Sequence, residues 1–284
     1  MTMVQQSSAA RSGQDLLTSL STVLPRVIFA GYLILFLLYL FLPLIIMGAA
    51  TFNTSKFPTV TPWLGTTLQW FDALWADRAM WQSLWLSILI GLAVIAFALP
   101  VGTAAALFLT SVDARMHSFL YSVMVSPLLT PGVAIGISTL ILWRQIGVSG
   151  GTFLIIIAQA SFITAYVMLM VVARLQRFDR IQEEAALGLG ASRFMIFRRV
   201  LLPYLRPSLI AAAFIAFLQS FENYNTTLFV RGTETPLTVY IATKVRTGLT
   251  PAVNALALIL ILLTIVAAVT AEIVRRRKPT RASN

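Results

Sequence analysis

Few side chains in this 284-residue chain have the types and spacing that enzyme chemistry requires. A P-loop places Lys directly after Gly, and none of the three lysines, Lys56, Lys244 and Lys278, follows a glycine. The run at 147–151, GVSGG, matches the serine-hydrolase elbow, but the predicted topology places the only histidine, His117, on the opposite membrane face. With one histidine and no cysteine, the chain lacks the ligands of a transition-metal site. We therefore expect no catalytic residue, no metal site and, at 147–151, a flexible turn.

The longest charged segment between two apolar runs spans residues 183–203, EEAALGLGASRFMIFRRVLLP. Glu183 and Glu184 suit the first turn of a helix, where the macrodipole favours negative charge. Gly188 and Gly190 disfavour helix and predict a bend, followed by a second, arginine-rich helix that Pro203 ends. Such a pair of helices suits docking into a groove on another protein. A solvated amphipathic loop on anionic headgroups is the alternative.

A second polar group follows at Glu222, Asn223, Tyr224 and Asn225. A carboxylate inside a membrane span is costly, so it faces a water-filled path or a partner. The amides and the tyrosine ring offer hydrogen bonds and a π-face, which suit amines. The sequence leaves two readings of Glu222 open. It lies on a substrate path for a cation, or the helix ends near Phe221 and Glu222 caps an outer loop.

The composition places these segments in a polytopic membrane protein. Hydrophobic residues make up 58% of the chain and charged residues 11%, against about a quarter charged in soluble domains. The net charge of +11 marks cytoplasmic loops rather than a nucleic-acid site, because the basic residues flank apolar runs. The polar N-terminus lacks the short apolar core of a cleaved signal peptide.

The apolar runs predict an all-α fold with six transmembrane helices and no second domain. A tail at 1–26 precedes the domain at 27–274, and a basic tail follows at 275–284. The predicted spans are 27–50, 83–110, 118–143, 152–173, 207–230 and 247–271. Pro127 and Pro131 break or kink the third span. The run at 132–136, GVAIG, predicts close helix packing.

Six spans put both termini on one side, and charge decides which side. Fifteen of the 21 Lys and Arg residues fall in the loops and tails of that side, so both termini and the 174–206 loop are predicted in the cytoplasm. The outer loop at 51–82 carries Trp63, Trp70, Trp75 and Trp81. These rings suit the headgroup layer, and a small packed subdomain is the alternative.

The 183–203 segment resembles the signature loop of ABC-importer permeases. That pattern is Glu-Ala-Ala, three residues, Gly, nine residues, Ile, one residue, Leu-Pro. Six of its seven positions match here, at Glu184, Ala185, Ala186, Gly190, Leu202 and Pro203, while Val200 replaces the isoleucine. The loop lies between spans four and five, where the family carries it, and the resemblance covers about residues 25–275.

This resemblance implies a type I importer permease of the bacterial inner membrane, with a cytoplasmic coupling helix between helices 4 and 5. ATP and Mg would bind a separate ATPase subunit, present in two copies, so this chain would hold no cofactor and would not be an enzyme. The other partners would be a second homologous permease, the lipid membrane and an extracytoplasmic binding protein received by the loops at 51–82 and 231–246. No nucleic-acid partner is expected.

The strings SFENYNTTLFV and PAVNALA are similar to those of spermidine/putrescine-type permeases. That type tends to carry acidic residues where Glu222 and Asn223 stand, and Asn223 removes one of the two charges that suit a dication. The resemblance implies half of a translocation pathway for a small polar solute, with a polyamine or related amino compound as cargo. The alternatives are a secondary transporter or channel without an ATPase, an intramembrane enzyme and a scaffold.

Overall fold

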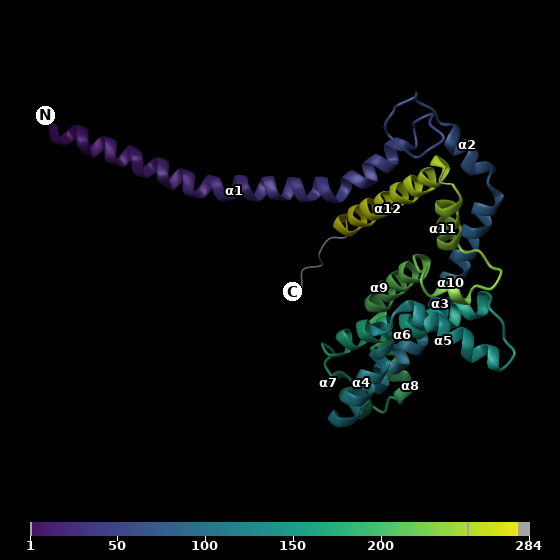
Figure 1. Cartoon of the computed structure of the whole chain (residues 1–284). Coiled ribbons are helices and arrows are strands. Elements are labelled where there is room, and N and C mark those ends of the chain that lie inside the picture. The colour runs from purple at the N-terminus through teal and green to yellow at the C-terminus, as the bar shows by residue number, and fades with distance from the viewer. Residues whose placement is uncertain (1, 249, 278–284) are drawn as a thin grey trace. The chain divides into compact units, whose positions relative to one another are not determined.

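The computed structural model describes residues 2–248 and 250–277, and these residues form helices joined by short loops, with one isolated β-bridge between Asn53 and Thr66 (Figure 1). The elements are α1 (Thr2–Ala50), α2 (Gln69–Ala76), α3 (Arg78–Ser111), α4 (Ala114–Leu129), α5 (Gly132–Gln145), α6 (Thr152–Leu175), α7 (Ile181–Gly188), α8 (Arg193–Ile196), the π-helical turn η1 (Phe197–Leu201), α9 (Leu202–Phe221), α10 (Thr227–Val230), α11 (Leu237–Thr247) and α12 (Pro251–Arg277). Residues 278–284 of the predicted basic tail lie outside the described residues.

The chain forms two compact units. One contains Met1–Ala76 and Leu249–Asn284, and the other contains Asp77–Gly248. In the first unit α1 packs on α12, with Leu258 Cδ1 only 3.3 Å from where a Cβ on Gly48 would lie. Residues 2–26, predicted as a tail, are helical and continue directly into the first predicted span.

The loop after α1 is organised around the buried Asn53. Its side-chain amide donates to the carbonyls of Thr59 and Pro62, and its Oδ1 accepts from the Leu64 N–H at 3.0 Å. Its carbonyl accepts from Trp70 Nε1 at 2.7 Å. These bonds give the loop a packed interior, as in the subdomain alternative, and they account for one of its four tryptophans.

The core of the second unit is the contact between α3, α6 and α9, which lie side by side in Figure 1. Small residues allow this close approach: a Cβ on Gly102 of α3 would lie 2.8 Å from the Thr164 carbonyl oxygen of α6. Fully buried side chains such as Val94, Ile163 and Leu205 fill the interface. The predicted spans 83–110 and 152–173 lie within α3 and α6.

The third predicted span, 118–143, is not one continuous helix. It is divided into α4 and α5, whose axes are bent by 100° at Thr130–Pro131. Proline has no N–H and disfavours helix in the residue before it, so the hydrogen-bond ladder stops there. The sequence expectation of a break or kink at Pro127 and Pro131 is met by a break at Pro131, while Pro127 lies inside α4.

The fifth predicted span, 207–230, is not one continuous helix, because α9 ends at Phe221, as one of the two readings of Glu222 expected. The helix α9 starts at Leu202 and stops at Phe221, and a loop at 222–226 separates it from the short α10. Asn223 Oδ1 accepts from both the N–H and the hydroxyl of Thr227, at 3.2 and 3.1 Å. Asparagine side chains that bond nearby backbone in this way compete with helical hydrogen bonds and favour turns.

Pro203 was expected to end a helix, and this expectation is also wrong. The chain runs from α8 through η1 into α9 as one apolar helical stretch, Arg193–Phe221. We attribute the continuity to η1, in which the Leu202 N–H bonds the Phe197 carbonyl. A π-helical turn widens the helix locally, where a proline ring would otherwise clash with the carbonyl four residues earlier.

Four described helices are long and apolar enough to cross a membrane: Pro25–Ala50, Arg78–Ser111, Thr152–Leu175 and Arg193–Phe221. The bent pair α4–α5 would make a fifth. The apolar part of α12, Pro251–Val266, is shorter than these, and α12 begins four residues after the predicted start of span six at 247. The described residues therefore form an all-α membrane protein.

Candidate functional site

The predicted docking segment forms a short helix with defined ends. Glu183, Glu184, Ala185 and Ala186 lie in α7, whose first N–H, from Ile181, is accepted by Asp179 Oδ1 at 3.0 Å. Both carboxylates occupy the first turn, as the macrodipole favours. Val200 lies in η1, and Leu202 and Pro203 begin α9. The segment at 183–203 therefore comprises most of α7, all of α8 and η1, and the start of α9.

Gly190 provides the bend after α7. Its φ of +82° lies in the left-handed region that favours glycine. The Ala191 N–H bonds the Ala186 carbonyl at 3.0 Å and the Gly190 N–H bonds the Leu187 carbonyl at 2.9 Å. This pair of bonds is the Schellman motif, which satisfies the last carbonyls of a helix. The glycine at this position of the segment thus has a backbone role.

Apolar side chains of this segment face solvent. Ile181 is 69% exposed, Leu189 89% and Phe194 71%. Leu187 and Met195 add further exposed apolar surface on either side of the Gly190 bend. Phe194 and Met195 belong to the apolar stretch Arg193–Phe221 that can cross a membrane. Ile181, Leu187 and Leu189 lie outside the candidate spans, where exposed apolar side chains mark an interaction site.

The segment is attached to the core helices by specific contacts. Arg180 Nη2 donates to the carbonyl of Thr110 at the end of α3, at 2.8 Å. The Arg174 guanidinium lies 4.1 Å from the Tyr204 ring centroid, and the Tyr204 hydroxyl donates to the Arg174 carbonyl at 3.2 Å. The first contact joins the N-cap residue of α7 to α3, and the other two join α6 to α9.

The second predicted group lines a pocket of about 320 Å³. Glu222, Asn223, Tyr224 and Asn225 all contribute to its wall. The rest of the lining comes from the α4–α5 break and from α5, α6, α9 and the following loop: Pro127, Leu128, Thr130, Gly132, Ile135, Phe162, Tyr166, Gln219 and Thr226. Glu222 is the only charged residue in this lining, and three aromatic rings, Phe162, Tyr166 and Tyr224, belong to it.

The structure gives Glu222 two features. α9 ends at Phe221, and Glu222 is its exposed C-cap residue. Its side chain nevertheless lines the pocket. A carboxylate beside tyrosines and amides attracts an ammonium group and hydrogen bonds it.

Two glycines of the predicted packing motif bring α5 against this pocket loop. A Cβ on Gly136 would lie 2.7 Å from the carbonyl oxygen of Thr226, and a Cβ on Gly132 would lie 2.9 Å from its Oγ1. The expectation of close helix packing is thus met by packing against a loop. The absent side chains allow the 222–226 backbone to lie directly on α5.

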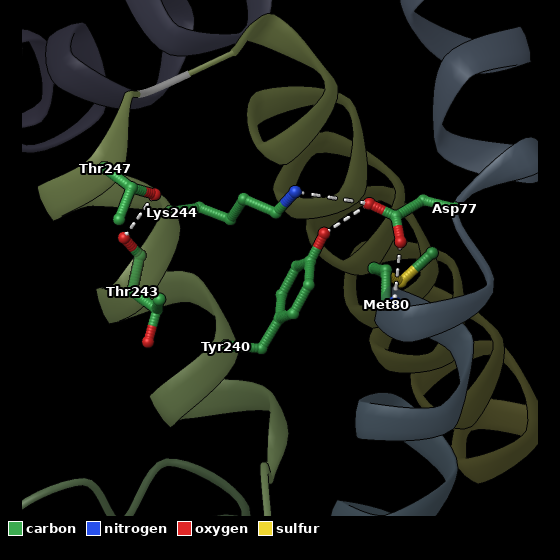
Figure 2. A network of polar contacts seen from close by, with 6 residues as sticks. All are labelled: Asp77, Met80, Tyr240, Thr243, Lys244 and Thr247. Atoms are coloured by element: carbon green, nitrogen blue, oxygen red, sulfur yellow. Dashed lines mark hydrogen bonds and ion pairs between the residues drawn. The ribbon is translucent and has the colours of Figure 1, made fainter.

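A polar cluster at the start of α3 fixes the neighbouring helix α11 (Figure 2). Asp77 is the N-cap of α3, accepting from the Met80 N–H at 3.0 Å. The same carboxylate accepts the Tyr240 hydroxyl and lies 3.7 Å from Lys244 Nζ. The Leu237 N–H at the start of α11 adds a bond of 2.8 Å to Ser87 Oγ.

The surroundings of Asp77 and Tyr240 in this cluster shift the pKa values of both side chains. Burial raises the pKa of Asp77, but the hydrogen bonds from Tyr240 and the backbone, together with Lys244, outweigh it and hold the pKa below 3.8. Burial and the bond to the Asp77 carboxylate raise the pKa of Tyr240 well above its usual range. The pair therefore stays as carboxylate and neutral phenol at neutral pH.

α11 also contacts the pocket loop. The Thr238 hydroxyl donates to the Asn223 carbonyl at 3.2 Å, and Arg246 Nη2 lies 3.4 Å from the Tyr224 hydroxyl. Sequence reasoning missed this helix and its partners Asp77 and Tyr240. The two residues are 163 positions apart, so no local pattern joins them.

Sequence reasoning also missed Gln159, which is 2% exposed in α6 and bonds across to α9 and α10. It is the only Asn or Gln within the 152–173 run, and that isolation was an available signal. Among the described residues, no group of three His, Cys, Asp or Glu side chains is placed to hold a metal ion.

Known proteins resemble this chain in sequence and in fold. A family model described as "Binding-protein-dependent transport system inner membrane component" matches residues 98–278. The chain is 30% identical over 256 residues to the spermidine/putrescine transport system permease protein PotC of Escherichia coli K12, covering 89% of this chain and 96% of that protein. It is 33% identical over 231 residues to the putrescine transport system permease protein PotI of the same organism, covering 78% and 82%.

Solved structures share the fold at lower identity. A bacterial ABC transporter involved in the import of the acidic polysaccharide alginate has a chain with a TM-score of 0.68 at 17% identity, covering 92% of this chain and 98% of that one. An amino acid ABC transporter reaches 0.55 at 18% identity, covering 74% and 100%. The arrangement of helices is therefore that of ABC importer permeases.

Proposed function

We propose that this chain, which belongs to the family of binding-protein-dependent transport system inner membrane components, forms half of an importer's translocation pathway. ATP hydrolysis in a separate subunit drives it. The observation that carries this proposal is the α7 segment. It combines a helix, a glycine bend and exposed apolar side chains. Its N-cap residue Arg180 bonds α3, and the chain continues through α8 and η1 into α9.

In this proposal α7 is the coupling helix. Its small Ala185 and Ala186 let it lie deep in a groove of the ATPase, and Ile181, Leu187 and Leu189 bury their exposed surface there. ATP and Mg bind that partner, of which the complex holds two copies, and this chain is not an enzyme. Closure of the ATPase dimer displaces α7. ATP shifts the permease between its two conformations only because the complex binds ATP with a different affinity in each conformation.

The pocket at 222–226 is the substrate path of this proposal. Its one carboxylate, three aromatic rings and amide side chains suit a compound that carries an ammonium group. Relatives at 30% and 33% identity are named as spermidine/putrescine and putrescine permeases. A polyamine or related amino compound is therefore the proposed cargo.

The complete transporter would contain further chains. A second homologous permease supplies the other half of the path, and an extracytoplasmic binding protein docks on the loops at 51–82 and 231–246. Both termini and α7 lie in the cytoplasm, in agreement with the excess of Lys and Arg in those segments.

The test is purification of the tagged chain with whatever it binds, followed by uptake in proteoliposomes. We expect a P-loop subunit to co-purify in equal amounts with the permeases, and labelled putrescine or spermidine to accumulate only with ATP and binding protein. Uptake driven by an ion gradient without any ATPase subunit would instead show a secondary transporter or channel and would overturn the proposal.

A further inference from the structure

A chain of directed hydrogen bonds joins α6 to the pocket loop. The Ser220 hydroxyl at the end of α9 donates to Gln159 Oε1, and Gln159 Nε2 donates to Thr227 Oγ1 at 2.8 Å. The Thr227 hydroxyl in turn donates to Asn223 Oδ1 at 3.1 Å. The chain therefore spans the break between α9 and α10, and it ends on a residue of the pocket wall.

These groups lie away from solvent. Gln159 is 2% exposed, Ser220 5% and Thr227 1%. An unpaired polar group in such a site carries its full desolvation cost, so the network holds its members in place strongly. Asn223 Oδ1, the last acceptor of the network, also accepts from the Thr227 N–H at 3.2 Å, so it satisfies a backbone group after the end of α9.

Glutamine satisfies this site without a proton rearrangement, whereas glutamate and leucine do not. The residue at 159 must accept from Ser220 and donate to Thr227, because the single Thr227 proton is already directed at Asn223. A glutamate carboxylate only accepts, and a leucine does neither. The side chain at position 159 must therefore have the length of glutamine and carry one acceptor and one donor at its tip.

We propose that Gln159 is a positioning residue of the translocation path: through Ser220, Thr227 and Asn223 it fixes the loop at 222–226 in the geometry that presents Glu222 and Tyr224 to the substrate. The effect of Gln159 on transport rests on the proposed function, whereas its effect on the loop at 222–226 does not. Gln159 itself is absent from the pocket lining, so its effect is indirect.

The loop can be tested with a buried cysteine, because the natural chain contains none. Thr226 is fully buried and its hydroxyl has no hydrogen-bond partner, so Thr226→Cys is a mild reporter. In membrane vesicles, Gln159→Leu should raise the rate at which a water-soluble maleimide labels this cysteine by about tenfold, as expected for loss of two buried hydrogen bonds. An unchanged labelling rate would overturn the proposal.

Two further variants keep the test decisive if Gln159→Leu fails to fold. Gln159→Glu retains the shape but removes the donor to Thr227, and Ser220→Ala removes one bond only. Both should raise the labelling rate, and Ser220→Ala less. Ser161→Ala on the same helix is the control, since its hydroxyl bonds only the Ala158 carbonyl of α6, and it should leave the rate unchanged.

The transport arm uses the assembled complex and labelled putrescine. Gln159→Glu should reduce uptake by about tenfold while ATP hydrolysis stimulated by the binding protein stays within about twofold, because the loop and not α7 is disturbed. A parallel loss of uptake and hydrolysis would show general structural damage and contradict a positioning role. If the natural complex takes up no putrescine, the proposed cargo fails, and the labelling rates still decide whether Gln159 fixes the loop.

Discussion

At the scale of single residues, Gly190, Glu222 and Gln159 each have a different physical reason for their residue type. Gly190 is set by backbone geometry, because φ of +82° and the Schellman bonds leave little choice of residue. Glu222 is set by charge, because it is the only charged side chain in the pocket wall. Gln159 is set by hydrogen bonding, because its neighbours require both a donor and an acceptor.

Glu222→Gln removes this charge and keeps the size of the side chain. We expect uptake of a cationic amine to fall by about tenfold or more, since a hydrogen bond to a charged group contributes about 1.5–3 kcal/mol. Initial uptake rates in proteoliposomes measure the effect. Asp113→Asn is the control, because Asp113 is the exposed N-cap residue of α4, does not line the pocket, and asparagine caps a helix about as well. Equal losses from both variants would contradict a specific role of Glu222.

Gly190→Ala places a side chain at a positive φ, which costs about 1–2 kcal/mol. We expect the bend after α7 to deform and ATP-driven uptake to fall severalfold, while the amount of protein in the membrane is unchanged. Gly188→Ala is the matched control, because Gly188 lies in α7 with nothing within 4 Å of its added Cβ. The account fails here if Gly190→Ala transports as well as Gly188→Ala.

At the scale of elements, interruptions of helices create the pocket. The α4–α5 bend and the end of α9 at Phe221 both expose polar groups to the same cavity. Pro131 made the first interruption readable from sequence. The second depends on Asn223 bonding Thr227 and on Gln159 from another helix. The lone Gln159 in an apolar run was a signal, but local sequence does not show which residues it bonds.

Gly136→Ala tests the packing of α5 on the pocket loop. The new Cβ would lie 2.7 Å from the Thr226 carbonyl oxygen, so the loop must shift, and overpacking of this kind costs about 1–3 kcal/mol. We expect a lower melting temperature in detergent. Gly31→Ala in α1, where the Cβ meets nothing within 4 Å, should instead leave stability unchanged or raise it slightly through helix propensity.

The Asp77 cluster gives a pH prediction. Because the folded-state pKa of Asp77 is lowered, its contribution to stability is present above the unfolded pKa of about 3.9 and is lost as pH falls through the folded value. Melting curves recorded as the pH is lowered from about 7 to below about 4 should show a loss of stability on the acid side. Asp77→Asn should abolish this loss.

Tyr240→Phe provides the matched experiment at neutral pH. It removes one hydrogen bond to Asp77 and should lower stability by roughly 1 kcal/mol. Tyr39→Phe, at an exposed position of α1, should have no effect. Equal melting temperatures for Tyr240→Phe and the natural chain would show that the cluster does not hold α11 to α3.

At the scale of the whole molecule, the α7 segment and the pocket belong to one compact unit, Asp77–Gly248, built on α3, α6 and α9. Long apolar runs made these helices predictable, because a 30 Å hydrocarbon core leaves few other structures. The spacing from Glu184 to Pro203 made the docking segment recognisable. A helix end near Phe221 was one of two readings of the sequence. The choice between them, the π turn before Pro203 and the role of α11 depend on contacts between distant residues, and local sequence does not encode these contacts.

The central claim is that α7 couples this chain to a separate ATPase, and cross-linking from Leu189 tests it most directly. Leu189 is 89% exposed beside the Gly190 bend, so a photoreactive residue placed there contacts whatever covers α7. We predict one dominant cross-link in intact membranes, to a chain that carries a P-loop, and its loss when Gly190→Asp is added. Cross-links to lipid alone, or to a protein on the outer face of the membrane, would contradict the account.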